Sequence, residues 1–158
     1  MGQGREARKG EGKPRSKMSK IDRILVEVQR NLRDSCEPAT LTDLTAFERK
    51  RIHRFFDGNP EFETKTYRTD GNYVLKVFPV GNIRRLAEQK AEEARQRQCV
   101  VALPPMGSFE RFVVHNALKQ FNDLETVSVG EGAERHVEIR PRLYGRGLKR
   151  IIKKIKLL

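Results

Sequence analysis

The sequence of 158 residues has no tryptophan, only two cysteines and no run of 18 apolar residues, and its mean hydropathy is −0.69. Without such a run, a helix that spans a membrane is ruled out. The low hydropathy also argues against a large enclosed active site. Cys36 and Cys99 lie 63 residues apart with no metal-site spacing, so neither a disulfide framework nor a zinc site is expected. The first residues lack the apolar segment of a secretory signal, and we expect a reducing, cytoplasmic location.

Basic residues are in excess, and the excess lies at the two ends of the chain. Lysine and arginine outnumber the acids 33 to 21, for a net charge of +12. Residues 1–20 carry +5 and residues 140–158 carry +8, whereas residues 21–139 sum to −1. A near-neutral body with two basic tails is typical of a protein that binds polyanions, nucleic acid first and anionic lipid second.

An internal repeat appears when the sequence is shifted by 62 residues. Segment 41–49 then aligns with segment 103–111, His53 with His115, and Pro79 with Pro141, without a gap. Apolar positions match in step although few residues are identical. We therefore expect two copies of one unit, at residues 20–79 and 82–141.

Each copy shows the same order of local patterns. An amphipathic helix and a short strand precede a second helix, for which Thr45 or Ser108 is the expected N-cap. A hairpin follows, with a turn rich in glycine. The predicted fold is therefore α+β, two repeats of an α-β-α-β-β unit with a three-stranded antiparallel sheet packed with helices. Segments 1–19 and 142–158 are predicted to be basic flexible tails. One spacing predicts the buried face of the second helix, with apolar residues at every fourth position: Phe109, Val113, Ala117 and Phe121.

An Arg-x-x-x-His pair recurs at the same point of both copies, as Arg49 with His53 and Arg111 with His115. Four residues apart on a helix, the two side chains share one face. A guanidinium fork and an imidazole one turn apart suit a phosphate oxygen and the neighbouring sugar or base. The plainer interpretation is a solvated arginine with a histidine packed at the sheet edge. We expect both side chains to be exposed, so that replacing Arg111 and His115 with alanine weakens binding without unfolding the protein.

Segment 103–115, with Glu125-Thr126 and the Ser128-Val-Gly-Glu-Gly-Ala-Glu-Arg135 hairpin, resembles the R-three-H domain. The nearest version is similar to the C-terminal domain of bacterial Jag-type RNA-binding proteins, including the charged helix at 83–98. The resemblance implies a small domain that binds single-stranded nucleic acid. It assigns the motif pair to Arg111 and His115, with Arg135 as a third contact.

The first copy departs from this pattern. It keeps Arg49 and His53 but replaces the glycine-rich hairpin with Tyr67-Arg-Thr-Asp-Gly. Lys50 and Arg54 make its helix more basic, which favours nucleic-acid contact, although the copy is equally suited to dock on the second. No Gly-x-x-Gly occurs, so the KH module that usually precedes the Jag-type domain is absent.

Segment 148–158 is predicted to be a basic amphipathic helix that becomes ordered on binding. Three interpretations stay open: a clamp on RNA phosphates or the ribosome, a membrane-surface helix, and the last helix of the domain. The cations expected to contact nucleic acid in this region are Arg142, Arg146, Lys149, Arg150 and Lys153.

The function predicted from these observations is single-stranded nucleic-acid binding, RNA more than DNA, with low sequence selectivity. An enzyme is not expected, because the three histidines accompany no nucleophile, carboxylate pair or metal spacing. No cofactor is expected, and the oligomeric state is left open. The alternative is an adaptor that binds a protein or a membrane surface, with nucleic-acid affinity incidental.

Overall fold

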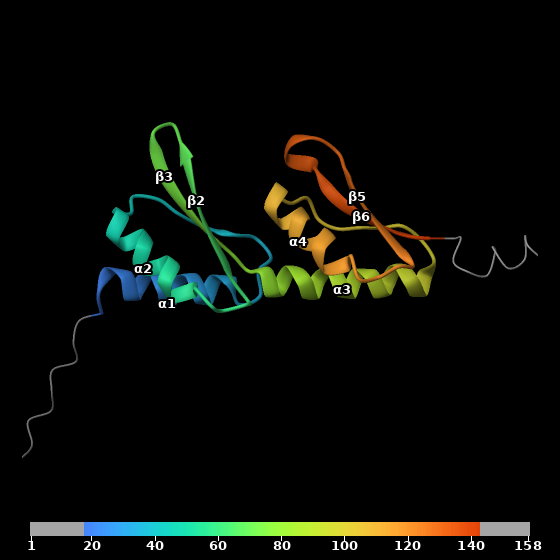
Figure 1. Ribbon diagram of the computed structural model, residues 1–158, viewed down its shortest axis with the longest axis horizontal. Helices are drawn as coiled ribbons and strands as arrows, with labels where there is room; N and C mark the ends of the chain where they lie inside the picture. Colours follow the sequence, from blue (N-terminus) through green and yellow to red (C-terminus); the bar gives the residue numbers. More distant parts are fainter. Residues whose placement is uncertain (1–17, 143–158) are drawn as a thin grey trace, which may run out of the picture.

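The computed structural model describes residues 18–142, and within this range the chain forms four helices and two three-stranded antiparallel sheets (Figure 1). The expected α+β class is confirmed. No helix in the described part of the chain has the length and apolar character needed to cross a bilayer. The elements are α1 (Lys20–Leu32), β1 (Ala39–Leu41), α2 (Ala46–Phe56), β2 (Glu63–Thr69), β3 (Asn72–Phe78), α3 (Val80–Arg97), β4 (Val101–Ala102), α4 (Ser108–Leu118), β5 (Leu124–Val129), a 3-10 turn (Gly132–Glu134) and β6 (His136–Pro141).

The two sheets have the same strand order and the same register. In the first sheet β3 lies between β1 and β2, and Val77 pairs with Ala39 on one side and Thr64 on the other. In the second, β6 lies between β4 and β5, and Ile139 pairs with Val101 and Thr126. Each of these pairings in the second sheet is a pairing of the first with 62 added to both numbers.

The second helix of each half begins in a different way. Thr45 caps α2 in a capping box with Glu48, as predicted. Ser108 is not a cap, because the helix begins one residue earlier than expected and Gly107 is the N-cap. A Cβ atom at Gly107 would lie 2.6 Å from the Glu110 carboxylate. The acidic side chain therefore fills the space in which a capping side chain would stand.

The buried face of α4 also differs from the prediction. Its buried residues are Glu110, Val113, Val114 and Leu118. Of the residues predicted at every fourth position, only Val113 is buried, while the others are partly exposed. Phe109 and Phe121 pack against the core cluster as partly buried residues, and Phe121 lies beyond the end of α4. A step of four residues turns an α-helix by about 40° beyond a full turn, so it does not stay on the buried side. The buried side is occupied by residues spaced both three and four apart, such as Glu110, Val113 and Val114.

The two halves share packing at their junction. One core cluster extends from Ile21 to Val77, and the other includes Phe78 at the end of β3 together with α3, α4 and the second sheet. Only the buried Pro79 separates β3 from α3. Cys36, in the loop of the first half, packs against the second cluster. Cys99 is exposed, although the apolar character of free cysteine favours a small core residue at both positions.

The molecule is elongated, with α1 and α3 following each other along one side and both hairpins projecting to the other (Figure 1). Asn82 links the two helices. Its side-chain amide lies 2.8 Å from the Leu32 carbonyl at the end of α1 and 2.7 Å from the Ser35 carbonyl. Arg85 donates to the amide oxygen of Asn82 and so fixes its orientation.

Replacing Asn82 with alanine is expected to lower the free energy of unfolding by about 1–2 kcal/mol, because partly buried carbonyls at and just after the end of α1 lose their donor. Asn31→Ala is the matched control, since Asn31 is exposed on α1 and its loss is expected to change stability by less than about 0.5 kcal/mol. Urea unfolding of both variants measures the difference. Equal stability of the two would contradict the role given to Asn82.

Candidate functional site

His115 joins α4 to strand β5 through both of its ring nitrogens. Nδ1 lies 2.7 Å from the Thr126 hydroxyl and Nε2 lies 2.9 Å from the Ser128 hydroxyl. The two hydroxyls stand on alternate residues of β5, so they point to the same face of the sheet. A neutral imidazole has one donor and one acceptor, and a hydroxyl can complement either. The ring therefore holds the helix at one place on the strand.

The expectation that Arg111 and His115 are both exposed is wrong, because both are half-buried. Helical spacing places the two side chains on one face but does not show that strand β5 lies against that face. Loss of His115 is consequently expected to affect stability as well as any binding. Arginine substitutions are the cleaner probe of this site.

Arg111 and Arg135 are held beside the same loop residue. Arg111 Nη1 donates to the Met106 carbonyl over 2.8 Å, and the Met106 N–H donates to the Arg135 carbonyl over 3.1 Å. A guanidinium has five N–H groups, so most of those of Arg111 are left for a ligand. Within residues 18–142, neither arginine forms an ion pair with a carboxylate. The Arg111 guanidinium is thus positioned by a backbone carbonyl, Arg135 is joined to the same loop residue through its main chain, and neither charge is neutralised by a carboxylate of residues 18–142.

The pKa of His115 is held below its ordinary value. Burial of the ring is the larger cause, and the positive charge of Arg111 adds to it. Both effects disfavour the protonated imidazole. At neutral pH, His115 is accordingly a neutral hydrogen-bonding group rather than a cation.

The first half repeats these contacts. Arg49 Nη1 donates to the Leu44 carbonyl over 2.5 Å. His53 lies 2.6 Å from the Thr64 hydroxyl through Nδ1 and 2.9 Å from the Thr66 hydroxyl through Nε2. Every residue in this set precedes its counterpart in the second half by 62. Arg49 and His53 are also half-buried.

The halves differ beside the arginine. The guanidinium of Arg49 lies over the ring of Tyr73, 4.6 Å from its centroid, where the second half has Arg135. An arginine stacked on a tyrosine keeps its charge and gains a planar support. The first half therefore presents one cation and one aromatic ring where the second presents two cations.

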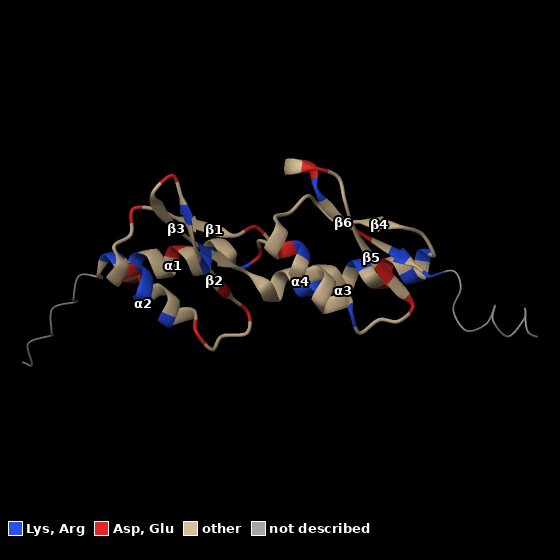
Figure 2. Ribbon diagram, turned by 45° about the horizontal axis from the view of Figure 1, so that its top comes forward, with Lys and Arg blue, Asp and Glu red and all other residues tan. Residues whose placement is uncertain are grey.

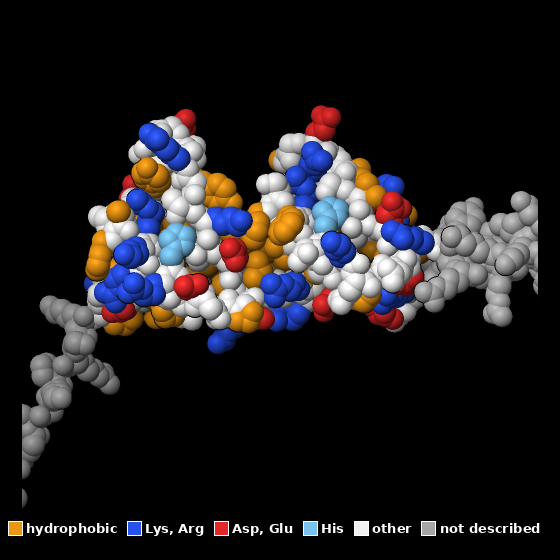
Figure 3. All heavy atoms as spheres, in the orientation of Figure 1, with side chains coloured by type: hydrophobic (Ala, Val, Ile, Leu, Met, Phe, Trp, Pro, Cys, Tyr) orange, Lys and Arg blue, Asp and Glu red, His pale blue; other side chains and the backbone are white. Residues whose placement is uncertain are grey.

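Both Arg-x-x-x-His helices lie on one side of the molecule. Figure 3 shows histidine atoms on this face over α2 and again over α4, with basic side chains near each. Figure 2 shows Lys and Arg along α2 and the strands beside it. Lys50 and Arg54, which the sequence predicts as further contacts, are exposed on α2.

The structure of residues 18–142 does not place the remaining predicted nucleic-acid contacts on this face. Arg142 bonds to the backbone carbonyls of Asn122 and Asp123, at the end of the second sheet opposite the β5–β6 hairpin, and so lies apart from Arg111. Arg146, Lys149, Arg150 and Lys153 lie outside the described residues.

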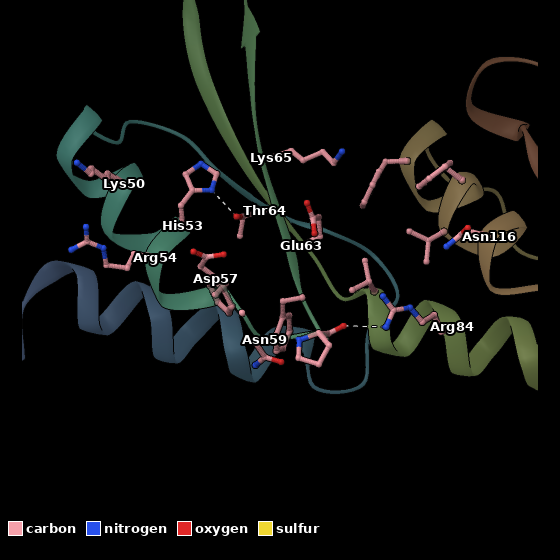
Figure 4. A pocket seen from close by; sticks show the side chains of 18 residues that line it. Lys50, His53, Arg54, Asp57, Asn59, Glu63, Thr64, Lys65, Arg84 and Asn116 are labelled. Carbon is pink, nitrogen blue, oxygen red and sulfur yellow. Dashed lines mark hydrogen bonds between the residues drawn. The ribbon is translucent and has the colours of Figure 1, made fainter.

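Sequence reasoning missed a groove of about 860 Å³ between the two halves. Residues of α2 and β2 line one wall, and residues of α3 and α4 line the other (Figure 4). Lys65, Arg84 and Phe112 belong to it, and none of them is part of the Arg-x-x-x-His pattern. One signal was available: Phe112 is a large apolar residue directly after Arg111, outside the buried positions of the helix.

Comparison with known families gives one match. A family model described as the R-three-H domain matches residues 81–141, which extend from the first turn of α3 to the end of β6. Domains of this family generally bind single-stranded nucleic acids. No curated protein matches the chain.

The lowered pKa of His115 predicts a pH-dependent stability. The unfolded chain takes up a proton on this ring near pH 6.5, whereas the folded protein does so only at lower pH. The His115 contribution is therefore fully present above pH 6.5 and is lost as the pH falls toward the folded-state pKa. Titration of the His115 ring protons by NMR is expected to give a pKa below 6.5. A value at or above it would show that the ring is not desolvated as described.

Proposed function

We propose that this protein binds single-stranded nucleic acid, RNA in preference to DNA, and is not an enzyme. The observation that carries the proposal is the placement of Arg111 and His115 on α4 inside the segment that matches the R-three-H domain. The preference for RNA rests on the resemblance to Jag-type proteins. Ribosomal RNA is one candidate target.

In the proposed mode of binding, Arg111 and Arg135 hold phosphates of the strand. His115 acts mainly by fixing α4 on β5, because both of its ring nitrogens already have partners within the protein. The edge and face of its half-buried ring remain for a sugar or base. Contacts of this kind are made to the sugar–phosphate backbone of the nucleic acid, so sequence selectivity is expected to be low.

We further propose that residues 20–79 and 82–141 are two copies of one unit and that both contact the strand. The identical pairing registers and the two histidine bridges, each offset by 62 residues, support this. In the first copy Arg49, Lys50 and Arg54 would bind phosphates. The basic tails at 1–19 and 142–158 would add affinity through charge.

The proposal predicts a specific effect of Arg111→Gln on affinity for labelled single-stranded RNA. Loss of one charged contact is expected to weaken binding roughly tenfold and to reduce the log–log dependence on salt by about 0.7. Fluorescence-anisotropy titrations of the full chain at several salt concentrations measure both quantities.

Arg97→Gln is the matched control, because Arg97 lies at the far end of α3 and pairs with Glu93. It removes the same charge and is expected to leave affinity within about twofold of the unaltered protein. If the two variants weaken binding equally, only the total charge matters, and Arg111 is not part of a site.

A further inference from the structure

The groove between the two halves connects the surfaces to which binding is assigned above, and the inference drawn from it rests on that proposed function. Residues of the first Arg-x-x-x-His helix, including His53, line one side, and Phe109, Phe112 and Asn116 of α4 line the other. A strand that contacts both α2 and α4 has to cross it. Figure 4 shows Lys65 reaching from β2 toward α4, and Asn116 on the facing wall.

Basic side chains predominate in this groove. Lys50, Arg54, Lys65 and Arg84 line it, against the acids Asp57 and Glu63. None of the four cations forms an ion pair with a carboxylate of residues 18–142. Arg84 donates instead to the Pro60 carbonyl over 3.2 Å. The cations are therefore available to a polyanion, while the two acids disfavour a phosphate next to them.

Phe112 supplies a ring at the wall of the groove. Its side chain is 61% exposed and belongs to neither core cluster. The ring stacks near that of Phe109, with centroids 6.2 Å apart and planes at 27°. Phe109 in turn packs on the buried Phe78, with centroids 4.6 Å apart. A row of rings thus runs from the core to the surface and supports Phe112 from behind.

Direct contacts join the two walls of the groove. The ammonium of Lys65 lies 4.0 Å from the centroid of the Phe109 ring, so a strand of the first half touches the helix of the second. Pro79 and the hydrogen bonds of the Asn82 side chain also join the two halves. A groove of this kind requires little ordering when a ligand enters, which lowers the free-energy cost of binding.

We propose that this groove receives an unpaired nucleotide of the bound strand, with its base stacked on Phe112 and its phosphates beside Lys65 and Arg84. Stacking on an aromatic side chain needs a free base face, which a duplex does not offer. Asp57, Glu63 and Asn116 are then placed toward the base, whose amino groups they can accept from, rather than toward phosphate. The ring therefore contributes to the choice of single strands over duplex.

The test compares Phe112→Ala with Phe55→Ala in the full chain. Phe55 is also an exposed phenylalanine, 47% exposed, but it lies on α2 outside the groove. Base stacking on one aromatic residue corresponds to a change in affinity of roughly five- to 150-fold. Phe112→Ala is expected to weaken binding of single-stranded RNA by at least about fivefold without changing the salt dependence, because no charge is removed. Phe55→Ala is expected to bind as the unaltered protein does.

A second probe separates stacking from an indirect effect. On an oligonucleotide of the same length whose central nucleotides lack bases, Phe112→Ala and the unaltered protein are expected to bind equally. Urea unfolding of both variants checks that they keep the fold.

Two results would overturn the inference, and they differ from failure of the proposed function. If Arg111→Gln weakens binding while Phe112→Ala binds RNA normally, the strand does not use the groove. Equal loss on the abasic strand would show that Phe112 acts without stacking. If the unaltered protein binds no single strand at all, the proposed function itself fails.

Discussion

The bridge from a helix histidine to two strand hydroxyls is the interaction on which the surface of each half depends. His53 and His115 each use both ring nitrogens, and their partners stand two residues apart on the neighbouring strand. Because alternate strand residues point to one face, the pair of hydroxyls fixes both the position and the rotation of the helix. The arginine one turn earlier lies on the same helix and is therefore oriented with it. Its guanidinium donates to a carbonyl of the loop before the helix. The histidine that the sequence pattern predicts as a ligand contact therefore has a structural role first.

The arrangement of the halves converts two such surfaces into one face. Because α1 and α3 follow one another and both hairpins project to the same side, the two Arg-x-x-x-His helices are not turned away from each other (Figure 1). Pro79 and the hydrogen bonds of Asn82 join the halves in this arrangement. The groove that results combines cations that lack carboxylate partners within residues 18–142 with an exposed ring, both suited to a flexible strand.

Much of this could be predicted from the sequence, because periodicity and turn residues determine local structure. The element order and the Thr45 cap agree with the prediction. Two predictions failed because they depend on neighbouring residues. Helix α4 begins one residue early, with Gly107 as its N-cap beside the Glu110 carboxylate. The exposure of His115 depends on β5 lying beside it. The alternation of Thr126 and Ser128 was a usable signal for that contact. The groove had none of comparable strength, because it arises from how the two halves meet.

The most direct test is a two-dimensional amide NMR titration of the full chain with a short single-stranded RNA. We predict that the largest shifts fall on α2, α4, the β5–β6 hairpin and the groove residues Lys65 and Phe112. Amides on the outer sides of α1 and α3 should change little. Shifts confined to residues 1–19 and 142–158, with α2 and α4 unaffected, would contradict this assignment and place binding in the tails alone.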